Sequence, residues 1–326
     1  MTTAPRGQVL VVAEDLDPSA DLVVQALADR NVPVMRFDLA RFPQDLELAA
    51  EHEGCAPGWS GELATSARAV RLEEVRAVYY RRPGLPEPSP AVAPEYRDWA
   101  VSQALVGMVQ VLGALPAVWM HHPDVYRAAA HKPGQLTAAT ASGLRVPRTL
   151  VTNSLSRARR WAESTSGSLI VKPVTAGAIT LTGRRAMLLP TRRFEADQLD
   201  ESLELTAHLL QEWVPKAFEV RLTVVGEQMF PVAIHAGSAA AQVDWRSDYD
   251  ALEYEPVPIP STVASGVRRF MDRYQLNYGA FDFAVTPNGD WVFFECNPAG
   301  QWQFIAVATH LPIAEAHASL LQGAVT

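Results

Sequence analysis

The chain has 326 residues, of which 48% are hydrophobic, and a formal net charge of −8. This length allows two or three structural units with a sizeable core, and the acidic balance argues against a general nucleic-acid binder. Two cysteines exclude a disulfide framework. We expect a cytoplasmic protein, because the cysteine content fits a reducing compartment and no signal peptide is visible.

The N-terminal part of the chain alternates strands and helices. Strands are predicted at residues 8–13, 32–37 and 77–83, and Asp17-Pro18 is typical of a helix start. This order predicts a parallel α/β unit, and the absence of a G-x-G-x-x-G loop argues against dinucleotide binding. Residues 99–120 carry no charge. We expect a buried core helix there that is too short to span a membrane, and we expect no membrane partner.

The rest of the chain predicts two further units. Helices are expected at residues 128–143, 156–164 and 192–210, with strands at 146–151 and 168–173. A strand-rich unit follows. We therefore predict an α/β (α+β) fold in three parts, with boundaries at residues 1–122, 123–210 and 211–326.

Two segments near the C-terminus carry the clearest chemical signal. Residues 281–286 and 291–297 are rich in aromatic and β-branched residues, and Asn288-Gly289 between them indicates a hairpin. If those two residues form the turn, Asp282 faces Glu295.

Asn297 then lies on the same face as Glu295, because side chains alternate along a strand. Two carboxylates about 5 Å apart repel by ~3 kcal/mol at an effective dielectric constant of 20, so Asp282 and Glu295 need a counter-charge or a shared proton. Carboxylate and amide oxygens suit Mg²⁺. The alternative is a solvent-facing strand edge with two unrelated acids.

A lysine and the loop after it suggest an anion site. Lys172 ends an apolar strand, and a buried ammonium needs an anion. Residues 174–183 supply backbone N–H groups and threonine hydroxyls that suit phosphates. The alternative is an ordinary hairpin with a lysine that reaches solvent. Lys132, in front of a predicted helix, shows nothing by itself.

Other candidates depend on their neighbours in the fold. Alternation in residues 218–224 puts Glu219, Arg221 and Thr223 on one face. That face is either solvated or a site where the guanidinium of Arg221 binds a phosphoryl group. Asp244-Trp245-Arg246 borders a small-residue loop, which either covers a site or lies on the surface.

Taken in order, these segments resemble an ATP-grasp ligase with a pre-ATP-grasp unit before it. The matching segments are Lys132, Ile170–Pro173, Gln211–Val214, Glu219-x-Arg221, Phe281–Phe283 and Glu295–Pro298. Within that superfamily the chain is similar to the peptide maturases that make graspetides, which are peptides crosslinked through side-chain esters or amides. That closer resemblance is carried by Tyr80–Pro83, Lys132–Ala139, Gly143–Asn153, Val243–Arg246 and Asn297–Trp302.

The resemblance implies an activity, cofactors and partners. The enzyme would activate Asp or Glu side chains of a ribosomal precursor peptide as acyl phosphates, with ATP and two Mg²⁺ as cofactors, and would form a homodimer. It implies phosphate binding by Lys132 and Lys172, nucleotide binding by Gln211, Glu212, Val214 and Glu219, metal binding by Asp282, Glu295 and Asn297, and catalytic roles for Arg221, Asp244 and Arg246.

Two further questions stay open at this point. The acidic residues Glu195, Asp197, Asp200, Glu201 and Glu204 either dock the leader peptide or form a solvated helix face. The activity is either intramolecular crosslinking, an intermolecular amino-acid or peptide ligation like that of RimK or D-alanine ligase, or nucleotide-dependent regulation without catalysis.

Overall fold

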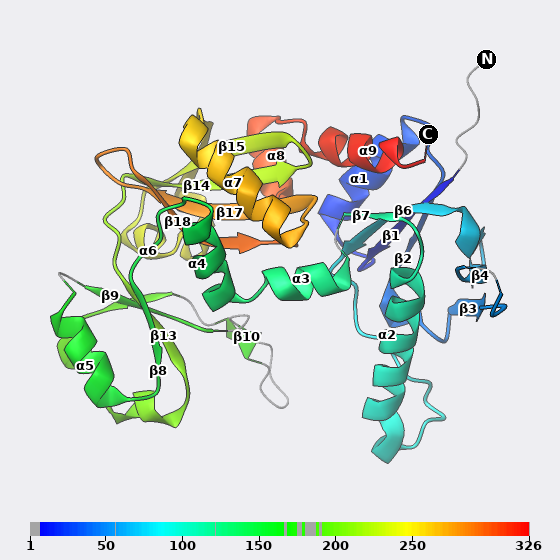
Figure 1. The fold of residues 1–326 in the computed structure, drawn as a ribbon, viewed down its shortest axis with the longest axis horizontal. Helices are drawn as coiled ribbons and strands as arrows, with labels where there is room; N and C mark the ends of the chain where they lie inside the picture. The colour runs from blue at the N-terminus through cyan, green and yellow to red at the C-terminus, as the bar shows by residue number, and fades with distance from the viewer. Residues whose placement is uncertain are drawn as a thin grey trace.

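The structure is a computed structural model that describes residues 7–55, 57–120, 122–165, 168–174, 178–179, 187–188 and 191–325. Figure 1 shows an N-terminal unit on one side, a small sheet at the opposite end and a larger sheet between them. This is the mixed α/β arrangement predicted from the sequence.

The N-terminal unit is built on a parallel sheet with the strand order β2-β1-β6-β7. Its strands are β1 (Gln8–Ala13), β2 (Val34–Phe37), β6 (Val75–Arg81) and β7 (Val118–Trp119). As predicted, Asp17 caps α1 (Pro18–Ala28) by accepting the Ala20 N–H, with Pro18 in the first turn. The antiparallel strands β3 (Leu46–Glu51), β4 (Ser60–Thr65) and β5 (Ala69–Arg71) were not predicted.

The uncharged segment forms α2 (Arg97–Gly113), but the prediction that this helix is buried is wrong. Only Met108 and Leu112 are buried in it, whereas the exposed fraction is 65% for Trp99 and 44% for Val106. The sheet covers one stripe of the helix, which extends away from it in Figure 1. Within the described part of the chain, no helix is long and apolar enough to cross a membrane.

The small sheet has the antiparallel order β12-β9-β13-β8 and packs against α5 (Leu155–Glu163). Its strands are β8 (Thr149–Thr152), β9 (Leu169–Lys172), β12 (Arg192–Phe194) and β13 (His208–Glu212). A two-stranded hairpin, β10 (Ala178–Ile179) with β11 (Met187–Leu188), belongs to the same region. Most of the loop 174–183, predicted to hold phosphates, lies outside the described residues.

The helix predicted at residues 192–210 is wrong, because both ends of this segment are strands of the small sheet. Between them lie short 3₁₀ turns whose first backbone N–H groups are accepted by acidic side chains such as Asp200. Asp and Ser compete with the helix for backbone donors in this way. The acidic residues are therefore exposed on turns rather than aligned on one helix face.

The larger sheet is antiparallel in the order β16-β15-β14-β17-β18. Its strands are β14 (Phe218–Val225), β15 (Gln228–Ala236), β16 (Leu252–Pro256), β17 (Tyr278–Val285) and β18 (Trp291–Asn297). The other helices of this part are α3 (Pro123–Ala129), α4 (Lys132–Ala141), α6 (Ala239–Val243), α7 (Ser261–Tyr274), α8 (Gln303–Thr309) and α9 (Ile313–Gly323). The predicted helix at 128–143 is interrupted at Ala130 and His131.

The two faces of this sheet have different partners. Apolar side chains of α4 and α7 pack against one face in a core that includes Phe270, Phe281 and Phe293. At one end of the other face, α9 packs against α1 and joins the larger sheet to the N-terminal unit in a common core. The rest of that face carries the polar side chains of the candidate site.

Candidate active site

The predicted pairing of Asp282 with Glu295 is confirmed. The turn beyond it differs from the prediction, however. Thr286 N–H donates to Asp290 O and Gly289 N–H donates to Thr286 O, each at 2.9 Å. Gly289 has φ +84°, so the turn contains three residues and ends in a left-handed glycine. On its own, this longer turn would shift the register by one residue.

A β-bulge between Asp282 and Phe283 restores the register. Phe283 pairs with Phe293, and the next pair is Asp282 with Glu295, so Phe294 is the extra residue. Strict alternation would point Phe294 into the core, but the bulge leaves that position to Phe293. Phe294 and Glu295 can therefore both line the same cavity although they are adjacent in sequence.

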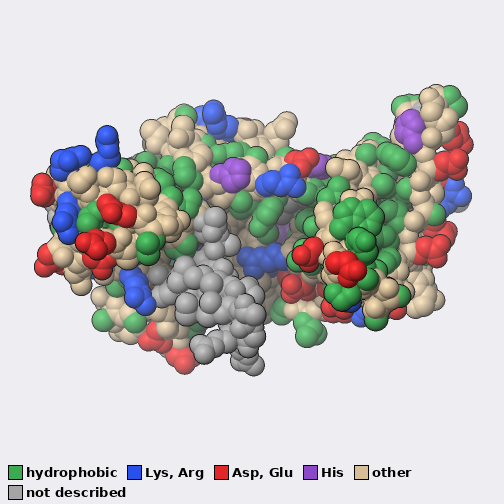
Figure 2. Space-filling view, turned by 90° about the horizontal axis from the view of Figure 1, so that it is seen from below, with side chains coloured by type: hydrophobic (Ala, Val, Ile, Leu, Met, Phe, Trp, Pro, Cys, Tyr) green, Lys and Arg blue, Asp and Glu red, His purple; other side chains and the backbone are tan. Residues whose placement is uncertain are grey.

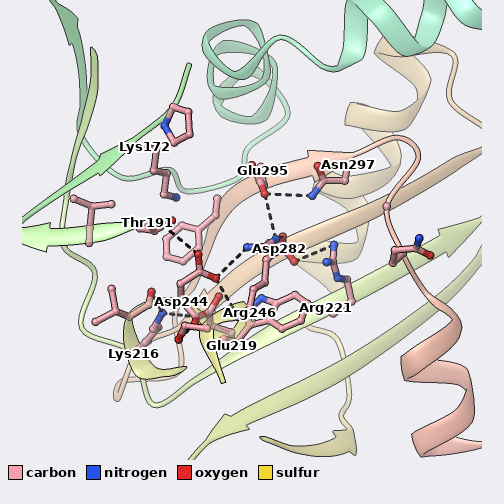
Figure 3. A pocket seen from close by; sticks show the side chains of 18 of the residues that line it. Lys172, Thr191, Lys216, Glu219, Arg221, Asp244, Arg246, Asp282, Glu295 and Asn297 are labelled. Carbon is pink, nitrogen blue, oxygen red and sulfur yellow. Dashed lines mark hydrogen bonds and ion pairs between the residues drawn. The ribbon is translucent and has the colours of Figure 1, made fainter. Parts of the chain in front are cut away.

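A cavity of about 690 Å³ lies over this hairpin. The lining includes every residue predicted to be catalytic, nucleotide-binding or metal-binding: Lys132, Lys172, Gln211, Glu212, Val214, Glu219, Arg221, Asp244, Arg246, Asp282, Glu295 and Asn297. Figure 3 shows charged side chains from β9, β14, β17, β18 and the segment after α6 converging here. In Figure 2 the surface is hollowed between the two ends of the molecule, with basic side chains in the hollow.

Arg246 supplies the counter-charge that the facing carboxylates require. Its Nη2 lies 2.8 Å from Asp282 Oδ2 and 3.4 Å from Glu295 Oε1. On the other side of Asp282, Arg221 Nη1 lies 3.2 Å from Oδ1. The two strands pair Arg221 directly with Asp282, and both side chains are buried. The alternative of unrelated acids on a solvated edge is therefore wrong.

The two carboxyl groups respond differently to burial. Burial raises the pKa of Asp282, although Arg221 and Arg246 oppose that rise. Burial also disfavours the Glu295 carboxylate, but Arg246, Lys132 and Lys172 outweigh it and lower the pKa of Glu295 to about 2. Asn297 Nδ2 donates to Glu295 Oε1 at 3.2 Å, which confirms that Glu295 and Asn297 share a face.

Trp245 fixes the two arginines of the site. The guanidinium carbons of Arg221 and Arg246 lie 5.3 Å and 4.7 Å from the centre of the buried Trp245 ring. Asp244 accepts the Arg246 N–H at 3.1 Å and also contacts the Arg246 guanidinium. This segment therefore covers the site, and the alternative of a plain surface loop is wrong.

Lysines approach the carboxylates from the small sheet and from α4. Lys132 Nζ lies 3.8 Å from Glu295 Oε2 and donates to Pro173 O at 3.0 Å. Lys172 Nζ lies 4.6 Å from the Phe294 ring centre, and burial lowers the pKa of Lys172. Lys172 is half-buried and points into the cavity, whereas an ordinary hairpin lysine would extend into bulk solvent.

β13 and the residues after it line one end of the cavity. Gln211 Nε2 donates to Thr149 Oγ1 at 3.1 Å, and Glu212 Oε1 accepts the Arg148 N–H at 3.0 Å. Val214 is buried there. The side chains of Gln211 and Glu212 are thus held by β8 and the residue before it, which fixes the strand that borders this end.

Glu219 lies deeper in the cavity and pairs with Lys216. Burial raises the pKa of Glu219, and Lys216 partly offsets that rise. Glu219, Arg221 and Thr223 are all buried, so the alternative of a solvated strand face is wrong.

Some residues that form the site were missed in the sequence. Gln135 is buried, donates to Ala129 O and Cys296 O at 2.6 Å and 2.7 Å, and accepts the Cys296 N–H at 2.8 Å. It holds β18 in place between Glu295 and Asn297. Lys216 and Phe294 also line the cavity. No local pattern indicated the pairing of Lys216 with Glu219, because residues three apart in a strand-rich segment point to opposite faces.

The donor set fits a hard divalent cation. Asp282 Oδ1 is buried and makes no hydrogen bond in the described structure, although Arg221 forms an ion pair with it, and Glu295 and Asn297 supply further oxygens on the same face. No group of three or more His, Cys, Asp or Glu side chains forms a metal cluster in the described ranges, so any site here needs the Asn297 amide. Arg246 now lies between the two carboxylates and would have to move.

None of the five acidic residues considered for leader docking lines this cavity. Glu195 Oε1 accepts the Ser168 hydroxyl at 2.5 Å, and Asp200 Oδ1 accepts the Ser202 N–H at 2.9 Å. All five are exposed.

Residues 8–127 match the family model described as the MvdD pre-ATP grasp domain. Comparison with curated protein sequences found no match.

Solved structures are similar over almost the whole chain. A RiPP-associated ATP-grasp ligase from Chryseobacterium gregarium, in complex with ADP and a leader and core peptide, has a TM-score of 0.89 and 25% identity over 97% of this chain and 96% of that chain. Macrocyclase MdnC from Microcystis aeruginosa MRC, bound with precursor peptide MdnA, has a TM-score of 0.85 and 27% identity over 97% and 99%. Macrocyclase MdnB from the same organism has a TM-score of 0.80 and 28% identity over 97% of this chain and 99% of that chain.

Proposed function

We propose that this chain, an ATP-grasp protein whose N-terminal unit matches the MvdD pre-ATP-grasp domain, is an ATP-dependent ligase that crosslinks a ribosomal precursor peptide. It joins an Asp or Glu side chain of the peptide to a hydroxyl or amine of the same peptide, as an ω-ester or ω-amide. One observation carries this function: two lysines, a hard-metal donor set, the buried Arg221 and the partly exposed Arg246 line a single cavity.

ATP is bound along the cavity between the two sheets. Lys132 and Lys172 neutralise its phosphates. Both ammonium groups are near Glu295, where the metal and the phosphates would meet. Among the described residues, Lys172 has no carboxylate within hydrogen-bond distance, so its charge is available to a phosphate. The adenine lies beside Gln211, Glu212 and Val214, which line the end of the cavity bordered by β13. Glu219 then faces the ribose region from β14.

Asp282, Glu295 and Asn297 would hold Mg²⁺, and we propose two ions. When bound, Mg²⁺ draws charge from the phosphate oxygens. The two facing carboxylates and the amide on the same face of the hairpin support this assignment. Arg246 is 39% exposed at its side chain, so it can leave the carboxylates without breaking the core.

The chain's own residues then serve the two chemical steps. In the first, a peptide carboxylate oxygen attacks the γ-phosphorus of ATP, the bond to the bridging oxygen breaks, and ADP leaves. Arg221, held by Asp282 and Trp245, neutralises the developing charge. Arg246, displaced from Asp282, turns toward the same phosphoryl group, while Asp244 keeps its backbone in place.

In the second step, a hydroxyl or amine of the same peptide attacks the acyl carbon. Phosphate leaves, and the nucleophile loses its proton. The peptide therefore loses one water for each bond formed, and the protein needs no covalent nucleophile. The main contributions of the residues are positioning and charge neutralisation.

The peptide and the assembly state complete the proposal. We propose that a basic residue of the leader peptide contacts the exposed acids Glu195, Asp197, Asp200, Glu201 and Glu204. Residues 99–113 of α2 carry no charge, and their exposed side chains, which include Trp99 and Val106, are suited to a homodimer contact. The division at residues 122 and 210 also stays a prediction.

The test uses the full chain with ATP, Mg²⁺ and a candidate ribosomal precursor peptide. We expect ADP release that depends on the peptide, and a peptide mass lower by one water for each bond. Addition of a free amino acid to the peptide would instead indicate an intermolecular ligase. ATP binding without peptide-dependent ADP release would indicate a regulatory protein.

A further inference from the structure

Arg82 is a cavity-lining residue to which the catalytic steps assign no part. It follows β6, in the N-terminal unit, and lines the cavity together with Pro18, Gly300 and Gln301. Its side chain is exposed, and among the described residues it has no hydrogen bond or ion pair. The cavity's other arginines both contact Asp282. The Arg82 guanidinium is therefore available to a ligand.

The backbone of Arg82 is held in an unfavourable conformation. Its φ is +42°, in the left-handed region that residues with a Cβ atom rarely adopt, and proline follows it. Such a conformation persists only where the flanking structure imposes it, and it clusters at ligand-binding sites. The flanks of Arg82 meet this condition on both sides.

On the N-terminal side, Arg81 is almost fully buried and forms a network with the cavity wall. It donates to Asp17 Oδ1 at 3.1 Å, to Ser19 Oγ at 3.1 Å, to Gly300 O at 3.2 Å and to Gln301 Oε1. On the C-terminal side, the Gly84 N–H donates to Asp38 Oδ1 at 2.7 Å. The position of Arg82 at the cavity rim is thus set by fixed anchors.

The chemistry of the rim indicates an acidic ligand. A guanidinium presents a planar fork of donors that matches a carboxylate. The carboxylate that is phosphorylated must lie at the γ-phosphate, beside Arg221. The rim at Arg82 is built by β6 and the loop after Asn297, whereas the nucleotide end is built by β13, in a different unit (Figure 1).

We propose that Arg82 binds a second carboxylate of the peptide, an Asp or Glu side chain of the core that is not being activated in that step. This inference rests on the proposed function. It makes Arg82 a residue that selects peptides with more than one acid and sets which acid enters the phosphoryl site.

The protein side of the test is Arg82→Asn. Asparagine tolerates the left-handed backbone, so the melting temperature should stay at or above that of the wild type. We expect the KM for the precursor peptide to rise about tenfold, as for loss of one charged hydrogen bond at a partly exposed site. The kcat at saturating peptide and the KM for ATP should change less than about twofold. Arg82→Lys should restore part of the peptide affinity.

Arg127→Asn is the matched control. Arg127 lies on α3, is 71% exposed at its side chain and does not line the cavity, so its replacement should leave the KM for the peptide unchanged. A rise in KM equal to that of Arg82→Asn would contradict the proposal, because a general loss of surface charge would then explain both.

The peptide side of the test replaces the core acids by amides, one at a time. For the peptide in which the acid bound by Arg82 is already an amide, Arg82→Asn should cause no further rise in KM. An equal effect of Arg82→Asn on every peptide, or none on any, would overturn the inference.

The two proposals fail in different ways. Absence of a crosslinked product with the wild type refutes the proposed function. Binding of a fluorescein-labelled precursor, measured by anisotropy, then decides the role of Arg82 without catalysis. Equal affinity of wild type and Arg82→Asn, or no binding by either, overturns the inference.

Discussion

Glu295→Gln probes the charge balance on which the site depends. In the folded protein the Glu295 pKa is about 2, against an ordinary value of 4.5. The contribution of this pKa shift to the free energy of unfolding is fully present well above pH 4.5 and is lost as the pH falls toward 2. Near pH 7 a shift of this size corresponds to about 3 kcal/mol, since one pKa unit is about 1.4 kcal/mol.

The measured loss should be smaller than this value. Asp282 faces Glu295, and its pKa is raised partly by the Glu295 charge, so removal of that charge relaxes Asp282. We therefore expect Glu295→Gln to lower the free energy of unfolding by about 2 kcal/mol at pH 7. If the pKa shift of Glu295 acted alone, the difference in free energy of unfolding between the wild type and Glu295→Gln would be about 0.8 kcal/mol smaller at pH 4 than at pH 7.

Urea denaturation of both proteins at pH 7 and pH 4, followed by circular dichroism, measures this difference. The matched control is Glu253→Gln, an exposed acid on β16 outside the cavity, which should change stability by less than about 0.5 kcal/mol. If Glu295→Gln is as stable as the wild type at pH 7, or if its deficit does not shrink at pH 4, the charge balance described here is wrong.

Three other substitutions test separate parts of the site. Asp282→Asn should lower kcat for peptide-dependent ADP release by about a hundredfold or more with an unchanged circular dichroism spectrum, and undiminished turnover would refute the metal assignment. Lys172→Gln should weaken ATP binding about tenfold in calorimetry. Because burial lowers the Lys172 pKa, the affinity of the wild type for ATP should decrease with rising pH before the pH at which an ordinary lysine loses its proton. The variant should not show this decrease. Gln135→Leu should cost about 3 kcal/mol in urea denaturation by leaving buried Cys296 and Ala129 backbone groups unpaired, and a cost below about 1 kcal/mol would contradict that role.

The hairpin shows how far the sequence determines this site. Alternation and the Asn-Gly signal predicted the pairing of Asp282 with Glu295, and the structure confirms it. The prediction assumed a two-residue turn and no bulge. The actual three-residue turn and the bulge at Phe294 shift the register in opposite directions, so they cancel at Asp282. Local sequence does not distinguish these solutions, because Pro-Asn-Gly suits both turns.

Long-range contacts mark the limit of prediction. The segment 192–210 was expected to be a helix, but tertiary pairing with β9 and β8 decides its ends. The contacts of Arg246 with Asp282 and Glu295 join positions 36 and 49 residues apart, which no local pattern reveals. The hairpin alone indicated a metal site at Asp282, Glu295 and Asn297, and only the resemblance of ordered segments joined it to the lysines and to Arg221. Arg82 lies in the matching segment Tyr80–Pro83, but no role was predicted for it, because its left-handed backbone depends on distant anchors.

The central claim is that this cavity uses ATP to activate a peptide carboxylate. Its most direct test is mass spectrometry of the precursor after incubation with the protein, ATP, Mg²⁺ and ¹⁸O-labelled peptide carboxylates. The account predicts loss of one water per crosslink, with ¹⁸O transferred from the peptide to the released phosphate. Crosslinked peptide with no ¹⁸O in the phosphate would contradict activation as an acyl phosphate.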